Sequence, residues 1–177
     1  MIQTPYKITI IYFSDHEFRQ VRMNQPHPTR VAPSWYGDSV GHYEGDTLVI
    51  DTVGVKGGPF SMIDMFGTPF TRALHVVERY RLLDDEAAKE GYARDAKENF
   101  QLRYSDAGPQ VDPDYRGKVL QLHFTVEDDG VFTMPWSATI TYRRGLNETP
   151  EYVCADNIHE YHESKDRVVP AATTPDF

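Results

Sequence analysis

Apolar and polar residues alternate along most of this chain, and the alternation resumes after each short turn. A period of two places successive side chains on opposite faces, which is typical of β-strands with one covered face. Such stretches occur at residues 7–13, 18–23, 36–43, 47–55, 74–83, 119–128 and 137–144, and a further short strand is expected at 152–155. About eight strands of this kind predict an antiparallel barrel of the calycin or lipocalin type.

The alternation of apolar and polar residues stops in two regions of the chain. Residues 84–117 begin as a polar, helix-compatible run and continue as a turn-rich linker, which predicts one helical insertion in the barrel. Residues 56–71 are rich in glycine and proline but carry scattered apolar side chains, which predicts a lid over a pocket or a plug in a barrel end. We therefore expect a single domain over residues 1–165 and an extended C-terminal tail over residues 166–177.

The net charge of the chain limits the classes of partner that we expect it to bind. The 177 residues carry a formal net charge of -9, so nucleic acid and acidic membrane surfaces are not expected to bind. The chain contains no run of about 18 apolar residues, so we expect no membrane span. The N-terminal residues lack a basic leader and a cleavage site, which as written predicts a cytoplasmic protein. A periplasmic or secreted location follows if a leader was trimmed from a longer precursor.

The strand at residues 74–83 contains an unusual carboxylate. Alternation places Val76, Glu78 and Tyr80 on one face, and His75 and Arg79 on the other. Glu78 should therefore point inward among apolar neighbours, where an unpaired charge costs several kcal/mol. Two interpretations remain open. The side chain is a general acid or base with a raised pKa, or it pairs with an arginine such as Arg19 or Arg22 and braces the sheet.

Histidines and a second carboxylate extend the catalytic candidates. His16 lies in the first turn and His75 begins the strand that carries Glu78, so both should stand at a barrel mouth, where His–carboxylate pairs suit proton transfer. Asp51 shares a face with Val49 and Val53. It is a further inward carboxylate if that face is the covered one, although the opposite face is an equal candidate for the core.

The remaining candidates concern ligands. Aromatic side chains are abundant, and we expect a small-molecule substrate to contact Trp35, Tyr12, Arg19, Tyr80, Phe124 and Trp136. No phosphate-binding loop, nucleophile elbow or dinucleotide fingerprint is present, so we expect no organic cofactor. The histidines show neither a helical His-Glu-x-x-His spacing nor a His-x-His doublet, so we expect no metal, although three strand histidines converging on an ion remain an alternative.

Several motifs are long enough to indicate a relationship. They are His27-Pro28, residues 35–52 (WYGDSVGHYEGDTLVIDT), residues 74–80 (LHVVERY) and residues 128–136, which begin with Asp128 and end in Pro-Trp. Together they resemble a large bacterial family of uncharacterised proteins over about residues 1–160, with Tyr43 in place of the family's tryptophan. The resemblance implies no settled activity. It places His16, His75, Glu78 and Arg79 on the family's motif, and it marks residues 84–117 as an insertion.

These observations favour a small-molecule enzyme in a calycin-like barrel. Glu78, together with His75 or His16, would transfer protons on an apolar or aromatic substrate, as a lyase, isomerase or hydratase does. A non-catalytic, lipocalin-like carrier and a metal-dependent barrel are the alternatives. The extended tail and the aromatic loop also predict a homodimer or a higher assembly.

Overall fold

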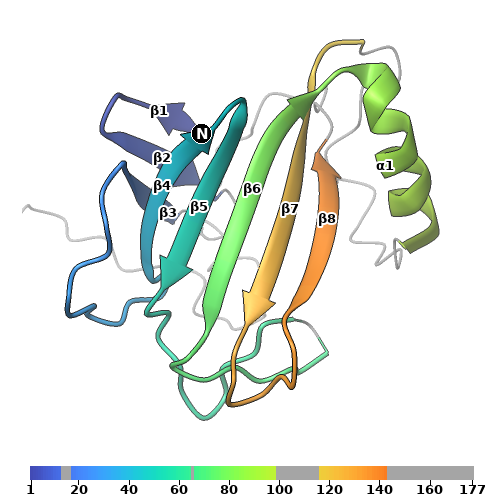
Figure 1. Ribbon diagram of the computed structural model, residues 1–177. Helices are drawn as coiled ribbons and strands as arrows, with labels where there is room; N and C mark the ends of the chain where they lie inside the picture. The colour runs from blue at the N-terminus through green and yellow to red at the C-terminus, as the bar shows by residue number, and fades with distance from the viewer. Residues whose placement is uncertain (13–16, 65, 99–115, 143–177) are drawn as a thin grey trace, which may run out of the picture.

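The computed structural model describes residues 1–12, 17–64, 66–98 and 116–142, which form one curled sheet and one helix (Figure 1). The strands are β1 (Ile2–Gln3), β2 (Lys7–Ile11), β3 (Phe18–Met23), β4 (Asp38–Glu44), β5 (Thr47–Val53), β6 (His75–Leu83), β7 (Val119–Glu127) and β8 (Trp136–Tyr142), and the helix is α1 (Asp85–Glu98). The mainly β fold with one helical insertion is confirmed, as a half-barrel. His16, the predicted strand at 152–155 and the tail lie outside the described residues.

The strands follow each other in chain order across the sheet, from β1 at one edge to β8 at the other. One pair departs from the expected antiparallel arrangement, because β3 and β4 run parallel, with Val21 opposite Ser39. A parallel neighbour requires a connection that returns the chain to the starting end of the strand. Residues 24–37, which contain prolines that cannot continue a strand, provide that return.

The curl gives the sheet an inner and an outer face. On β6, Glu78 and Tyr80 are buried on the inner face, whereas His75 and Arg79 lie on the outer face. The inner face holds the main apolar cluster, which consists of Ile8, Ile10, Val21, Met23, Leu48, Ile50, Tyr80 and Leu122. Gly41 contributes to the close packing there, because a Cβ at this position would lie 2.9 Å from the Val21 side chain.

Helix α1 packs on the outer face over β6 and β8 (Figure 1). Acidic residues occupy its first turn and Lys97 its last, an arrangement that the helix dipole favours. Ala88 is fully buried, and a Cβ at Gly91 would collide with the hydroxyl of Thr141, so the small residues let the helix approach the sheet closely. In the described part of the chain, the helix is too short and too polar to cross a bilayer.

Asp128 fixes the loops at one end of the sheet. It is 2% exposed, and its carboxylate accepts hydrogen bonds from the amide and hydroxyl of Thr71, at 2.6 and 2.7 Å, and from the amide of Gly130 at 3.0 Å. Burial alone would raise the pKa of Asp128, but these hydrogen bonds outweigh it and lower that pKa. The residue that opens one of the quoted motifs therefore ties the loop before β6 to the turn after β7.

Candidate functional site

Glu78 lies inside the half-barrel, as the alternation predicts. Its carboxylate oxygens lie 2.8 and 3.1 Å from Nη2 of Arg19 on β3, and the hydroxyl of Tyr80 donates to Oε1 at 2.8 Å. Strands β4 and β5 separate β3 from β6 in the sheet, so the curl is what brings these side chains together. The expected pairing of Glu78 with Arg19 is confirmed. Arg22 pairs with Asp38 instead.

This buried pair is not fully hydrogen-bonded. Oε2 of Glu78 makes its contact with Arg19 as an ion pair without hydrogen-bond geometry, and Nε of Arg19 is buried without a hydrogen-bond partner. A buried polar atom left without a partner costs about 1–3 kcal/mol. Burial and the Glu78 charge raise the pKa of Tyr80, so its phenol keeps its proton and donates.

Aromatic side chains surround this pair on the inner face. Tyr12 stacks on Tyr36 with a centroid distance of 5.3 Å, and Phe124 meets Trp136 edge-on at 5.7 Å. The predicted substrate contacts Tyr12, Arg19, Tyr80, Phe124 and Trp136 therefore share the inner face. Trp35 does not join them. It lies in the loop before β4, is 74% exposed, and packs under the ammonium of Lys56.

His75 and Asp51 lie on the outer face, and this corrects two predictions. Because side chains alternate across a strand, His75 cannot share a face with Glu78 on β6, so their expected pairing is wrong. Asp51 is likewise not an inward carboxylate, since Ile50 and Thr52 on either side of it are the buried residues. The two outer side chains do meet each other, with His75 Nε2 3.1 Å from Asp51 Oδ1.

A second histidine, which the sequence interpretation missed, completes this arrangement. His27, from the proline-rich loop, places Nε2 3.0 Å from the same Oδ1 of Asp51 and Nδ1 2.6 Å from Asp38. His75 places its other nitrogen 3.2 Å from Glu127. The resulting outer-face chain is Arg22, Asp38, His27, Asp51, His75 and Glu127. The signal that could have found it is the His27-Pro28 pair, which the quoted motifs already contained.

Cationic and anionic groups alternate along this outer-face chain when both imidazoles carry two protons. A neutral His27 ring would direct its unprotonated nitrogen at Asp38 or Asp51, so the two carboxylates favour its imidazolium. Burial by itself would lower the pKa of His27, but the hydrogen bonds to Asp38 and Asp51 and their charges raise it above the ordinary value. His27 therefore keeps its second proton to a higher pH than an isolated imidazole does.

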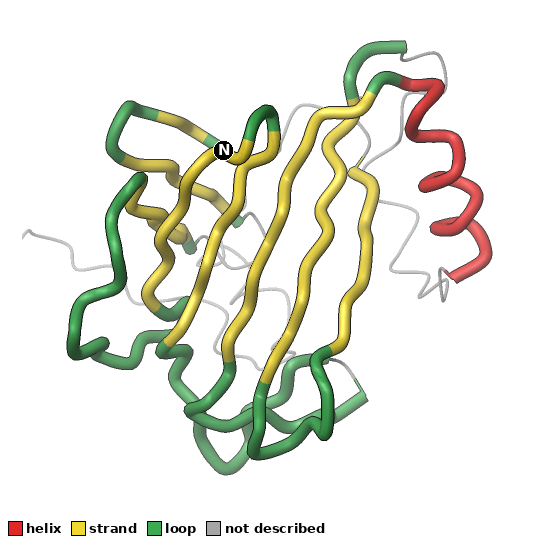
Figure 2. Tube along the Cα trace, in the orientation of Figure 1, coloured by secondary structure: helices red, strands yellow, loops and turns green. Residues whose placement is uncertain are grey.

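The outer-face chain is partly open to solvent, and apolar side chains are exposed at the same end of the sheet. The side chains of His75 and Asp51 are 31% and 38% exposed. Figure 2 shows that the loop between β5 and β6 and the loop between β7 and β8 lie at this end. Phe60, Met62 and Phe66 of the first loop and Met134 of the second are exposed, so these side chains do not fill the barrel interior.

The described side chains show no metal centre of their own. Among these residues, no group of at least three His, Cys, Asp or Glu side chains is arranged to hold an ion. Comparisons of this chain with family models, curated proteins and solved structures found no match. The family that the motifs resemble therefore stays a prediction.

Proposed function

We propose that this protein is an enzyme that transfers protons on a small apolar or aromatic molecule without an organic cofactor, as lyases, isomerases and hydratases do. One observation carries the proposal: Oδ1 of Asp51 lies within hydrogen-bond distance of both His75 and His27. Histidine is the common general acid and base near neutral pH, and a carboxylate that holds the ring fixes its orientation.

The exposed end of the outer-face chain would face the substrate. Among the carboxylates of the outer-face chain, that of Glu127 is the most exposed, at 46%. Its contact with His75 is the longest contact of the outer-face chain, at 3.2 Å. A substrate that displaces Glu127 from His75 would meet the imidazole directly. Asp51 and His27 would then supply or store the proton that His75 exchanges, and the exposed apolar loop residues would provide contacts for an aromatic ring.

Glu78 has a different part in this proposal. Glu78 is 7% exposed, and its carboxylate is held by Arg19 and Tyr80. We therefore assign this residue to bracing the half-barrel. The role expected for His16 stays a prediction, since that residue lies outside the described part of the chain.

Deuterium exchange tests the proposal without knowledge of the natural substrate. The wild-type chain is incubated in D₂O with a panel of aryl ketones, aryl enones and aryl β-hydroxy ketones, and deuterium incorporation is followed by NMR. We expect exchange on at least one compound, reduced by about 100-fold or more in D51N and H75N, because general acid–base catalysis contributes factors of that size. H42N is the matched control, since His42 is an exposed strand histidine on the same face that contacts Glu44 and belongs to neither site.

Two results would count against the proposal. The first is a wild-type protein that exchanges deuterium into no member of the panel. The second is exchange that D51N and H75N retain at the level of H42N. In either case the outer-face chain would be a structural ladder of ion pairs.

A non-catalytic carrier is the second candidate, because the atoms of Arg19 and Glu78 that lack hydrogen-bond partners and the aromatic inner face offer a ligand both polar and apolar contacts. Its test uses 1-anilinonaphthalene-8-sulfonate as the probe. If the protein is a carrier, the probe binds and F124A weakens it, while D51N binds it as the wild type does. Equal binding by all three proteins would argue against an inner ligand site.

A further inference from the structure

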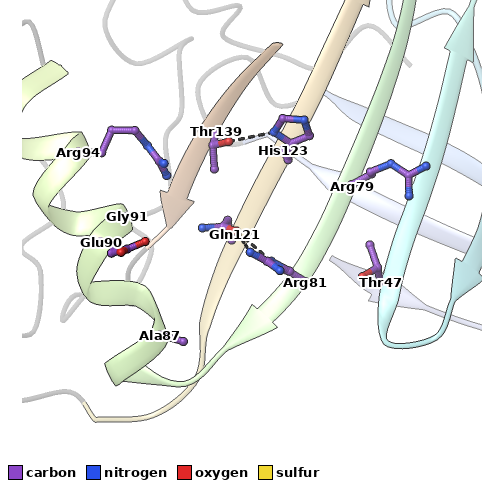
Figure 3. Close-up of a pocket in the computed structure, with 10 residues that line it drawn as sticks. All are labelled: Thr47, Arg79, Arg81, Ala87, Glu90, Gly91, Arg94, Gln121, His123 and Thr139. Atoms are coloured by element: carbon purple, nitrogen blue, oxygen red, sulfur yellow. Dashed lines mark hydrogen bonds between the residues drawn. The ribbon is translucent and has the colours of Figure 1, made fainter.

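A cleft of about 440 Å³ separates helix α1 from the outer face of β6, β7 and β8 (Figure 3). It is distinct from the outer-face chain, because the two share no residue. Cationic side chains enter it from two elements: Arg79 and Arg81 from β6, and Arg94 from α1. Such a gathering is unexpected in a chain whose formal net charge is -9, where an average cleft would be acidic.

Two of these guanidinium groups, Arg81 and Arg94, form no ion pair with the described residues. Nε and Nη2 of Arg81 both donate to the amide oxygen of Gln121, at 2.9 and 2.7 Å, which fixes the group but leaves its charge unbalanced. Nε of Arg94 is buried and has no hydrogen-bond partner. Within the described part of the chain neither arginine forms an ion pair, whereas Arg79 pairs with Glu44 at 2.6 Å.

The other polar groups around the cleft also fit an anion. Nδ1 of His123 is 2.9 Å from the Thr139 hydroxyl, so the ring is held in place and its Nε2 edge remains for another contact. Glu90 is the opposing feature, since its carboxylate also lines the cleft. One carboxylate against Arg81 and Arg94 leaves an excess of positive charge. Guanidinium groups in a fixed orientation recognise phosphoryl oxygens in pairs, which a lysine cannot do.

We infer that this cleft binds a phosphoryl dianion, carried by a small organic phosphate ester. The volume lies within the range of pockets that hold small ligands, which leaves room for an organic group beyond the phosphate. Arg81 and Arg94 bind the phosphoryl oxygens from opposite walls, and Gln121 keeps Arg81 aligned. The inference does not depend on the proton-transfer proposal, because it concerns other side chains.

Isothermal titration calorimetry of the full chain with phenyl phosphate and with inorganic phosphate, at constant ionic strength, tests the inference. We expect the wild type to bind, and R94Q to bind at least about tenfold more weakly, because hydrogen bonds to charged groups contribute that much. K89Q is the matched control. Lys89 lies on the same helix and pairs with Glu86 on the surface, so its loss should change affinity by less than about twofold.

The calorimetry results distinguish a phosphate ester, free phosphate and the absence of a site. Tighter binding of phenyl phosphate than of inorganic phosphate supports the ester, and equal binding assigns the site to free phosphate. No binding of either compound, or an equal loss in R94Q and K89Q, overturns the inference, since the effect would then be absent or due to surface charge alone. Thermal unfolding confirms that each variant is folded. If R94Q is not, R81Q replaces it, with the same expected loss.

Discussion

The carboxylates on the two faces of the sheet differ in their partners and in their exposure to solvent, and strands β5 and β6 show this most directly. On the inner face, Glu78 is compensated by Arg19 and hydrogen-bonded by Tyr80 in a nearly dry environment. On the outer face, Asp51 is shared by two imidazoles and is 38% exposed. The same kind of side chain is therefore held by a permanent counter-ion on the enclosed face and shared by two imidazoles on the face that is open to solvent.

The difference has a physical cause in the charges that each face can tolerate. A dry environment requires a permanent counter-ion, and an arginine keeps its charge at every accessible pH. Such a pair cannot exchange protons near neutrality. Histidine changes charge in that range, and partial exposure to water lets both of its protonation states exist. The outer face thus carries the groups whose charge is adjustable.

Breaking the inner pair should give the largest effect. E78Q leaves Arg19 as an uncompensated cation in the core, and we expect the free energy of unfolding to fall by about 3–5 kcal/mol. The double variant R19M/E78M removes both charges and should restore most of that loss, because well-packed apolar residues often replace a buried pair at no net cost. Chemical denaturation followed by circular dichroism measures both. If E78Q unfolds like the wild type, the pair is wetter than the structure indicates.

The pH dependence of stability should reveal the outer face with a smaller effect. The raised pKa of His27 in the folded protein means that its stabilising contribution is fully present below its unfolded pKa of about 6.5, and is lost as the pH rises through the folded pKa. The stability difference between wild type and H27Q should therefore be largest in mild acid and shrink toward alkaline pH.

Denaturant unfolding at a series of pH values measures this difference. H42Q is the control, since His42 is an exposed histidine of the same face that contacts only the surface carboxylate Glu44 in the described structure. A stability difference for H27Q that is constant with pH would show that His27 contributes through packing and not through its proton.

Alternation alone predicted much of the fold, because a period of two records which side of a strand is covered. It placed Glu78 inward, and the polar run after Leu83 predicted α1. The parallel β3–β4 pair was not predictable in this way. Strand direction depends on where the loop of residues 24–37 delivers the chain, and alternation carries no information about that.

The candidate site was predicted only in part, for a related reason. His75 and Asp51 were recognised as chemically interesting, but pairing His75 with Glu78 ignored the alternation that separates them. His27 lies in a loop without periodicity, and its contact with Asp51 depends on how that loop folds back over the sheet. Contacts made by loops across strands are tertiary, so composition and spacing cannot specify them.

The smallest expected effect concerns the surface pair of Glu44 and Arg79, and it connects the outer face with the arginine cleft. The two side chains are 49% and 42% exposed, so removing the carboxylate in E44Q should leave the thermal unfolding temperature nearly unchanged. The change should instead free the Arg79 guanidinium, which lines the cleft, and strengthen the binding of phenyl phosphate by about twofold. E86Q removes a more exposed carboxylate, 81% against 49%, from the Glu86–Lys89 pair on α1, which does not line the cleft, and so controls for the change in net charge. An equal gain in affinity in both variants would mean that the overall charge, and not the release of Arg79, governs binding. A gain confined to E44Q would show that the Glu44–Arg79 pair regulates the cleft, even though this pair contributes little to the stability of the fold.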